Sequence, residues 1–427
     1  MLIEFSVSNF RSFRARQTLS MVAAPRLRKK NNLFQPDVVG EKFPPLLKVA
    51  AIYGANASGK SSLLKAIEIL SRICNRKPSV QDDPLPVSPF RFDSALRNEP
   101  SRFEVHFIQQ KRRYSYELAL TASKIVEERF VAFVKGKTEL LFHRFQKDGR
   151  EEYLFGSFLE GGSELHDTWR KLTSSQTLFV MQAVANSNEE LTQLRIPFSW
   201  LSEGTLVVAS GMESIASLAQ RLVLDMPSFG DDAAALLRDV DVPISEIKVK
   251  AIDSGDQAGT IPIDSDRVSK SLPAVLRRGL KVKTTLTHQT TLGSAEFDFS
   301  EESDGTKNIF CFAFPWLVLR NQTAMSHKIL IVDELDSSLH PKVVEALIKR
   351  HLDDEAPTQL IFTTHDTHLM DTKLLRRDQF FLTERDATGA TQLRSIHDFE
   401  GRESEDIEKR YYEGRYRGLP MLRKTQK

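Results

Sequence analysis

A phosphate-binding loop between a buried strand and an amphipathic helix is the feature that most constrains how this chain of 427 residues can fold. Residues 54–61 read Gly-Ala-Asn-Ala-Ser-Gly-Lys-Ser, which fits the pattern G-x-x-x-x-G-K-[ST]. Residues 46–53 are almost continuously apolar, which is typical of a buried parallel strand. Apolar residues then recur at helical spacing, at Leu63, Leu64, Ile67, Leu70 and Ile73. This strand–loop–helix order predicts an α/β fold that binds a nucleotide.

The chemistry of the loop follows from its residue types. Glycines allow a tight turn whose backbone N–H groups surround phosphate oxygens, and the following helix presents its positive N-terminal end. Lys60 would reach the β- and γ-phosphates, and the Ser61 hydroxyl would coordinate Mg²⁺. A glycine-rich turn without a ligand is the alternative, and the flanking strand and helix argue against it. The predicted nucleotide-binding residues are Gly54, Asn56, Ala57, Ser58, Gly59, Lys60, Ser61 and Ser62.

Two carboxylates end a second apolar strand. Residues 329–332 are Ile-Leu-Ile-Val, and Asp333 and Glu334 follow directly. At the carboxyl edge of an open α/β sheet these side chains would face the nucleotide. Asp333 would hold Mg²⁺, and Glu334 would orient and deprotonate the attacking water. Taken alone, the pair also fits a plain strand end, but the phosphate loop upstream favours the catalytic interpretation.

The distance between these motifs indicates insertions. Asp333 lies 273 residues after Lys60, whereas one βα unit needs only about 30 residues. A hairpin is predicted at residues 102–108 and 113–120, and a polar loop at 253–270. The predicted division is 1–100 (first part of the ATPase core), 101–185 (β-rich insertion), 186–300 (helical lobe), 301–400 (second part of the core) and 401–427 (basic tail).

Composition excludes several classes of protein. Hydrophobic residues make up 41% and charged residues 27% of the chain, as in ordinary globular proteins. No apolar run reaches 18 residues, which argues against a membrane span, and the first ten residues lack the features of a secretion signal. Cys74 and Cys311 lie in apolar helical patterns and are predicted to be buried thiols. We therefore expect a cytoplasmic protein without a zinc site or a disulfide framework.

The net charge of +2 hides an uneven distribution of charge. Residues 11–30 carry +7 and residues 409–427 carry +6, which leaves −11 for the rest of the chain. Two basic segments on an acidic body could contact nucleic acid. Solvated basic surfaces without a ligand explain the same pattern, and the sequence leaves both interpretations open.

In its motifs the sequence resembles an ABC-type ATPase of the RecF, SMC and overcoming-lysogenization-defect (OLD) group. Five segments carry the resemblance: Asn-Phe-Arg-Ser-Phe at 9–13, the loop at 54–61, Ser-Asp-Gly-Thr-Lys at 303–307, Asp-Glu-Leu-Asp at 333–336 and Thr-Thr-His at 363–365. Within that group it is most similar to stand-alone abortive-infection ATPases (AbiL- and RloA-like). The segments 302–306, 339–341, 377–379 and 412–416 are shared with them.

The resemblance implies a P-loop NTPase fold: an ABC/RecF-like head with a β-meander insertion and a helical lobe. It also implies ATP and Mg²⁺ as cofactors and a head-to-head dimer that encloses two ATP molecules. Ser303, Gly305 and Thr306 would contact the γ-phosphate bound to the other head, and Asp336 would belong to the D-loop. Simple helix capping is the alternative for Ser303, with a helix expected from about Lys307 and kinked at Pro315.

Three further site residues rest on the resemblance. His365 would contact the γ-phosphate as the switch histidine; a metal pair with His368 and a purely structural histidine are the alternatives. Gln182 is assigned as the Mg²⁺-sensing glutamine, with Gln109 and Gln110 as competitors. Arg11 is assigned to a nucleotide phosphate, with an ordinary surface arginine as the alternative.

Departures from the group narrow the predicted function. A long coiled coil is missing, and Glu302 replaces the leucine that opens the usual signature. The 62 residues after His365 are too few for a Toprim nuclease domain of typical size. We therefore expect a sensor or scaffold in antiphage defence that dimerises, responds to a phage protein and controls a separate effector, with a Toprim-type nuclease as the candidate. A RecF-like repair clamp that binds duplex DNA is the alternative. A membrane partner is not expected.

Overall fold

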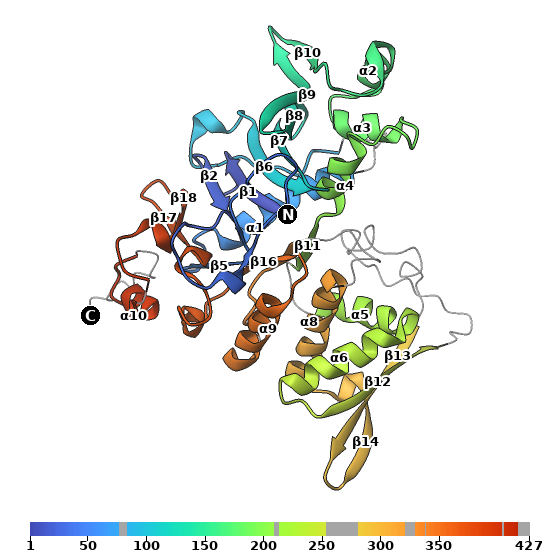
Figure 1. Cartoon of the computed structure of the whole chain (residues 1–427), viewed down its shortest axis with the longest axis vertical. Helices are drawn as coiled ribbons and strands as arrows, with labels where there is room; N and C mark the ends of the chain where they lie inside the picture. The colour runs from blue at the N-terminus through green and yellow to red at the C-terminus, as the bar shows by residue number, and fades with distance from the viewer. Residues whose placement is uncertain are drawn as a thin grey trace.

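The computed structural model describes residues 1–76, 83–208, 213–252, 281–320, 329–337, 339–403 and 405–416. Figure 1 shows a central α/β core between two further parts. A large antiparallel sheet lies at the top of the view, and a lobe of helices with a small sheet lies at the lower right. The predicted loop at 253–270 lies outside the described residues.

The central sheet carries the strands that precede both predicted motifs. Its order, within the described residues, is β11-β15-β16-β5-β17-β18. All neighbours are parallel except β17 and β18, which are antiparallel. The strands are β5 Val49–Gly54, β11 Thr205–Val208, β15 Ile329–Val332, β16 Gln359–Thr363, β17 Phe380–Arg385 and β18 Thr391–Ser395.

Both faces of this sheet are covered, as the continuous apolar runs predict. Ala50 and Ile52 belong to the apolar core that includes helix α1 (Lys60–Cys74). Ala51 and Tyr53 alternate to the other face, where they join the core formed with α8 (Asp304–Arg320) and α9 (Pro341–Asp353). The sheet therefore forms the middle layer of an α/β/α core.

The predicted strand at 46–53 is interrupted once. The short strand β4 (Leu46–Leu47) pairs with β3 (Leu33–Phe34), and β5 starts at Val49. Lys48 lies between them, and its ammonium donates hydrogen bonds to the backbone oxygens of Leu352 and Asp354 (2.6 and 2.9 Å). These two bonds provide the partners that a buried ammonium requires, and Lys48 separates the two strands.

The second sheet is antiparallel and contains the predicted hairpin. Its order, among the described residues, is β10-β9-β8-β7-β6-β1-β2. The hairpin prediction is confirmed, and β6 also pairs with β1 along six residue pairs. Residues 101–155 therefore extend a sheet begun by the N-terminus instead of forming a separate insertion. The strands are β1 Leu2–Ser8, β2 Gln17–Ser20, β6 Ser101–Gln109, β7 Arg112–Leu120, β8 Ile125–Val134, β9 Lys137–Lys147 and β10 Arg150–Phe155.

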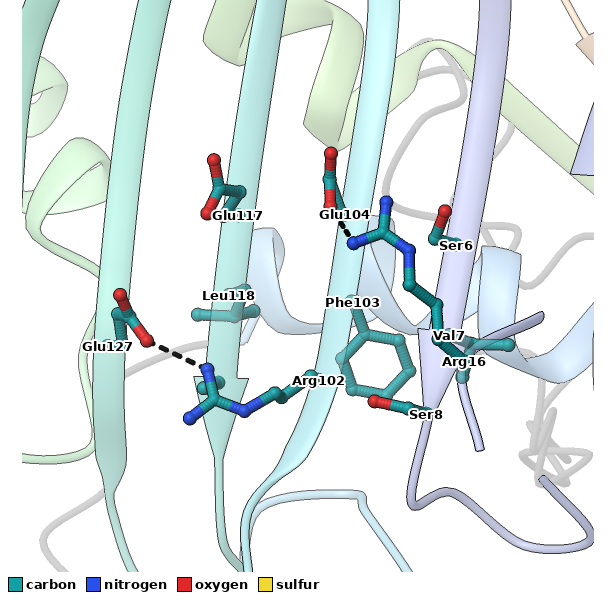
Figure 2. A pocket seen from close by; sticks show the side chains of 11 residues that line it. Ser6, Val7, Ser8, Arg16, Arg102, Phe103, Glu104, Glu117, Leu118 and Glu127 are labelled. Carbon is teal, nitrogen blue, oxygen red and sulfur yellow. Dashed lines mark hydrogen bonds and ion pairs between the residues drawn. The ribbon is translucent and has the colours of Figure 1, made fainter. Parts of the chain in front are cut away.

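The outer face of this sheet carries cross-strand ion pairs. Figure 2 shows a pocket of about 170 Å³ over β1, β6, β7 and β8. Arg16 pairs there with Glu104 (2.7 Å), and Arg102 pairs with Glu127 (2.8 Å). The hydrogen bond from His106, followed by that from Arg16, lowers the pKa of Glu104 to about 2. The arginines on this face are thus largely neutralised by neighbouring carboxylates.

The prediction of a helical lobe at 186–300 is wrong for its second half. Its helices are α4 Arg195–Glu203, α5 Glu213–Asp225 and α6 Pro227–Asp239. The described residues between 244 and 298 instead contribute a three-stranded antiparallel sheet of β12 Ile244–Ile252, β13 Lys281–Thr290 and β14 Gly293–Asp298. Both β12 and β13 are rich in β-branched residues, which favour strands.

The other α-helices in the described ranges are α2 Gly162–Leu172, α3 Phe179–Ala185 and α10 Ile407–Tyr412. Cys74 and Cys311 are both buried, as predicted. None of the helices in the described ranges combines the length and apolar character needed to cross a membrane.

The start of α3 depends on a buried carboxylate from the antiparallel sheet. Glu128 is fully buried and accepts hydrogen bonds from the backbone N–H groups of Phe179 and Val180 (2.7 and 3.0 Å) and from Tyr116 (3.1 Å). Arg144 lies 3.9 Å away and is also buried. Burial raises the pKa of Glu128, and Arg144 acts in the opposite direction.

We predict that Glu128→Ala lowers the free energy of unfolding by about 3 kcal/mol, because it leaves the buried N–H groups of Phe179 and Val180 without their acceptor and removes the carboxylate that faces the buried Arg144. Urea unfolding of the variant and the wild type side by side measures this difference. Glu127→Ala is the matched control. The Glu127 side chain makes only partly exposed ion pairs, so its removal should cost less than about 1 kcal/mol. Equal losses in both variants would contradict the assignment.

Candidate functional site

The phosphate loop has the backbone conformation that its sequence requires. It follows β5 and enters α1 through Gly59, whose φ of 114° is in the left-handed region. A Cβ atom there would lie 2.1 Å from the Thr391 hydroxyl, so only glycine fits. The Lys60 ammonium donates to the backbone oxygens of Gly54 and Ala55 (2.8 and 3.2 Å), which places it inside the loop.

Hydroxyl groups from segments that are distant in the sequence form hydrogen bonds around the phosphate loop. Ser58 Oγ lies 2.6 Å from Thr383 Oγ1 in the neighbouring strand β17. Thr391 Oγ1 donates to Ser58 O, and Ser12 Oγ is 2.8 Å from the same hydroxyl. Ser12 belongs to the motif at 9–13, but its role as a support was not predicted. Thr383 follows an apolar run, which was a usable signal, whereas nothing local marks Thr391.

One hydroxyl on β16 connects the two predicted acidic residues. Thr363 Oγ1 donates to Asp333 Oδ1 (2.6 Å) and accepts from the backbone N–H of Glu334 (2.7 Å). Because β15 and β16 are parallel neighbours, Thr363 lies directly beside the turn that follows β15. The Thr363 side chain therefore sets the positions of both carboxylate residues.

The backbone of Glu334 is strained. Its φ of 54° lies in the left-handed region, which a residue other than glycine rarely adopts. The hydrogen bond from its N–H to Thr363 holds this conformation, and its side chain is exposed. Such strain persists where the surrounding structure enforces it, and it is concentrated at functional sites.

The charged groups of the two motifs converge. Burial lowers the pKa of the Lys60 ammonium, and the carboxylates of Asp333, Glu334 and Asp336 act in the opposite direction. A lysine, three carboxylates and a loop of backbone N–H groups therefore meet at the carboxyl edge of one sheet. This edge is where open α/β sheets bind their ligands.

Comparison with known families identifies the fold family. Residues 49–371, more than half of the chain, match the family described as "AAA domain, putative AbiEii toxin, Type IV TA system". The chain belongs to this AAA-domain family. The matched region begins with β5 and ends after the predicted switch histidine, so it includes the phosphate loop and the acidic pair. The protein is accordingly a P-loop NTPase of the AAA type, related to abortive-infection families.

Solved structures of SMC heads are similar over nearly the whole chain at low identity. The SMC head domain from Thermotoga maritima is 12% identical, with 92% of this chain and 98% of that chain covered and a TM-score of 0.41. The SMC head of Pyrococcus furiosus bound to the C-terminal domain of ScpA is 9% identical, with coverages of 92% and 96% and a TM-score of 0.41. No curated protein matches this chain.

In this AAA-domain protein, His365 lies on an exposed loop after β16. Its backbone N–H donates to Asp336 Oδ2 (3.2 Å), so the predicted D-loop residue and the predicted switch histidine are in contact. His368 lies 3.6 Å from Glu408, an ion-pair geometry that does not involve His365. Among the described residues, no group of three or more His, Cys, Asp or Glu side chains is arranged to hold a metal ion.

The predicted signature segment begins a helix. Ser303 precedes α8, and its hydroxyl accepts from the Thr306 N–H (3.1 Å) and lies 2.9 Å from Thr306 Oγ1. The helix starts at Asp304, three residues before the predicted start near Lys307, because this cap completes the first turn. Gly305 lies within that turn, and Pro315 lies inside the helix, as expected from the sequence.

The remaining predicted residues lie on different elements. Arg11 has a φ of 52° and an exposed side chain, and it adjoins Ser12, which supports the loop through Thr391. Gln182 lies in α3, the helix whose start is fixed by Glu128, and its role remains a prediction. Gln109 ends β6, and Gln110 begins the turn that follows.

The residues present fit a magnesium–nucleotide complex. Ser61 in the first turn of α1 and Asp333 supply the hydroxyl and carboxylate oxygens that Mg²⁺ prefers. Asn56 and Ala57 form the exposed tip of the loop, and Ser62 follows Ser61 in the helix. Lys60 supplies a positive charge for the phosphates.

We predict that Thr363→Val lowers the rate of ATP hydrolysis at least tenfold, because Asp333 loses a donor and the strained Glu334 loses its acceptor. Thr363→Ser keeps the hydroxyl and should retain most of the activity. Steady-state ATPase assays of the two variants and the wild type measure the effect, and urea unfolding should show a loss of only about 1–2 kcal/mol for the valine variant. Equal activity of the valine and serine variants would contradict this role of Thr363.

Proposed function

We propose that this AAA-domain protein is a Mg²⁺-dependent ATPase whose nucleotide state controls a separate effector in antiphage or abortive-infection defence. The observation that carries the hydrolytic part is the Thr363 hydroxyl, which fixes Asp333 and the strained Glu334 near Lys60. Carboxylates beside a phosphate-binding lysine suit a site that activates water as well as binding a nucleotide.

Each group in the site has a defined task in this proposal. Glu334 accepts a proton from the water that attacks the γ-phosphate, and the Lys60 ammonium stabilises charge on the β- and γ-phosphates. When bound, Mg²⁺ supplies positive charge to the phosphate oxygens, and Ser61 and Asp333 are the residues that would hold it. Gln182 is proposed to sense that ion, and His365 and Arg11 to contact phosphate.

Dimerisation through two shared ATP molecules is the second part of the proposal. Ser303 and Asp304 are exposed at the start of α8, so a second molecule can reach this helix N-terminus. Exposed N–H groups and a serine hydroxyl suit a γ-phosphate bound by the other head. Gly305 allows close approach of the backbone, and Asp336 would lie beside the shared site.

The defence role rests on the family and on the motifs. The family is described by a putative toxin of a type IV toxin–antitoxin system, which connects it with abortive infection. We propose a Toprim-type nuclease as the separate effector and a phage protein as the trigger. In this role the dimer with bound ATP holds or releases the effector, and hydrolysis resets it.

The structure gives less support to the alternative of a DNA clamp. Arg14 and Arg16 of the basic segment at 11–30 form ion pairs with Asp93 and Glu104 (2.7 Å each). In the C-terminal segment, Arg415 pairs with Glu413 (2.9 Å). DNA phosphates would compete with these carboxylates for the three arginines.

We predict that Lys60→Ala weakens ATP binding at least tenfold, because it removes a charge-assisted contact to the phosphates. Lys65→Ala is the control, since Lys65 is exposed on the same helix.

Glu334→Gln should bind ATP normally and hydrolyse it 10²–10⁴-fold more slowly, because the base is lost. Binding is measured by titration with labelled ATP and turnover by phosphate release. Wild-type turnover in Glu334→Gln would refute the assignment of the base.

We predict that Glu334→Gln with Mg²⁺ and ATP forms pairs and that adding Ser303→Arg abolishes them while ATP still binds. An arginine at the start of α8 would block the approach of the second head. Native mass spectrometry measures the pairs, and Ser294→Arg on the exposed strand β14 is the control. Unchanged pairing in the Ser303 variant would exclude the composite site.

The same measurement on Glu334→Gln isolated from its own host tests the cellular role. A pair that carries a second protein, with little nucleic acid, is the result expected for an effector-controlling sensor. A pair that carries DNA and no protein would favour the clamp.

A further inference from the structure

The position of His365 depends on contacts outside the nucleotide motifs. Its side chain is exposed on the loop that leaves β16, and its backbone is fixed by a single hydrogen bond to Asp336 Oδ2 (3.2 Å). Asp366 caps the next turn by accepting from the His368 N–H (3.0 Å). The buried Leu369 then anchors the far end of the loop. Between these points, the Thr367 side chain contacts a further element.

Helix α10 provides that support through Thr367. The Thr367 hydroxyl donates to Glu408 Oε1 (2.7 Å) and lies 2.9 Å from the Tyr412 hydroxyl. Glu408 and Tyr412 are four residues apart, so both side chains lie on one face of α10. Glu408 also lies 3.6 Å from the His368 ring. Two side chains of α10 are thus hydrogen-bonded to Thr367, two positions after His365.

The helix is itself firmly held. Arg377 is buried and donates to the backbone oxygens of Ile396, Phe399 and Arg402 (3.2, 2.7 and 3.1 Å), which folds the preceding chain into place. Ile407 and Tyr411 of α10 pack in the core with Tyr416. Arg377 lies 6.0 Å from the ring of Tyr416. The motifs at 377–379 and 412–416 therefore build one rigid element beside the loop.

We propose that α10 positions the switch histidine and that Glu408 and Tyr412 are positioning residues that act on His365 through Thr367. They do not touch the nucleotide themselves. The inference rests on the proposed function insofar as it treats His365 as a group that acts during hydrolysis. Because Tyr412 is 60% exposed, the support is open to solvent, and changes at the surface of α10 should alter turnover.

The test compares turnover and substrate binding in variants of α10. Glu408→Ala and Tyr412→Phe should each lower kcat for ATP at least fivefold, with KM within twofold of the wild type, because Lys60 and the phosphate loop are unchanged. Glu408→Gln should retain most of kcat, since its amide oxygen still accepts from Thr367. Lys409→Ala, exposed on the same helix, is the control and should equal the wild type.

Thr367→Val tests whether α10 acts on the loop through the Thr367 hydroxyl. If Glu408 acts through Thr367, adding Glu408→Ala to Thr367→Val should lower kcat no further. The inference is overturned if the losses of kcat in the two single variants multiply in the double variant. Wild-type kcat in both Glu408→Ala and Tyr412→Phe would also overturn it. Tyr412→Phe removes one oxygen from an exposed ring, so it remains informative if Glu408→Ala fails to fold.

A second readout separates this inference from the proposed function. If the wild type has no ATPase activity, the proposed function fails, and positioning is then tested by amide hydrogen exchange. The amides of His368 and Met370 should exchange at least tenfold faster in Tyr412→Phe than in the wild type or Lys409→Ala. Unchanged exchange there would overturn the inference, whatever the outcome for hydrolysis.

Discussion

The parallel pairing of β15, β16 and β5 is the constraint on which the rest of the site depends. In parallel strands the carboxyl ends lie at one edge of the sheet, so the turns after these three strands meet there. Those turns are the phosphate loop, the acidic pair and the loop with His365. At their centre Thr363 uses one hydroxyl to fix Asp333 and the backbone of Glu334.

The supports of this edge come from the two ends of the chain. Ser12 follows the first strand of the antiparallel sheet, and Thr391 begins the last strand of the central sheet, yet both lie under the phosphate loop. Helix α10 reaches the loop of His365 in the same way. Long intervening segments are compatible with this arrangement, since the entropy of loop closure grows only slowly with length. The site is therefore a product of the whole core.

The antiparallel sheet and the lobe are connected to this core at defined points. Strand β1 starts the antiparallel sheet, and β11 brings the chain back to the edge of the central sheet before the lobe begins. Glu128 ties α3 to the antiparallel sheet with buried hydrogen bonds. Ion pairs such as Arg16 with Glu104 neutralise the outer face of that sheet. The start of α8 stays exposed, and the outer face of α10 lies beside the loop that carries His365.

Local patterns were sufficient where the interacting residues are close in sequence. The phosphate loop, the strand before Asp333 and the hairpin of β6 and β7 are coded by runs of a few residues, and the structure contains them. The break at Lys48 was not predictable, because its cause is a pair of carbonyl groups at the end of α9. The small sheet of β12 to β14 was missed because its short strands lack a regular apolar alternation and follow a segment with helical spacing.

The sequence by itself determined the chemical groups of the site and the strand, loop or helix on which each one lies. Backbone conformation and hydrophobic periodicity are local properties, so Gly59, Lys60, Asp333 and Glu334 could be assigned from their neighbours. Only the tertiary structure decided which hydroxyls support them and how Glu334 is strained, because those contacts join residues up to hundreds of positions apart. Side chains such as Thr391 and Tyr412 carry no local signal of these partners, and it is the order of strands in the sheet that brings them together.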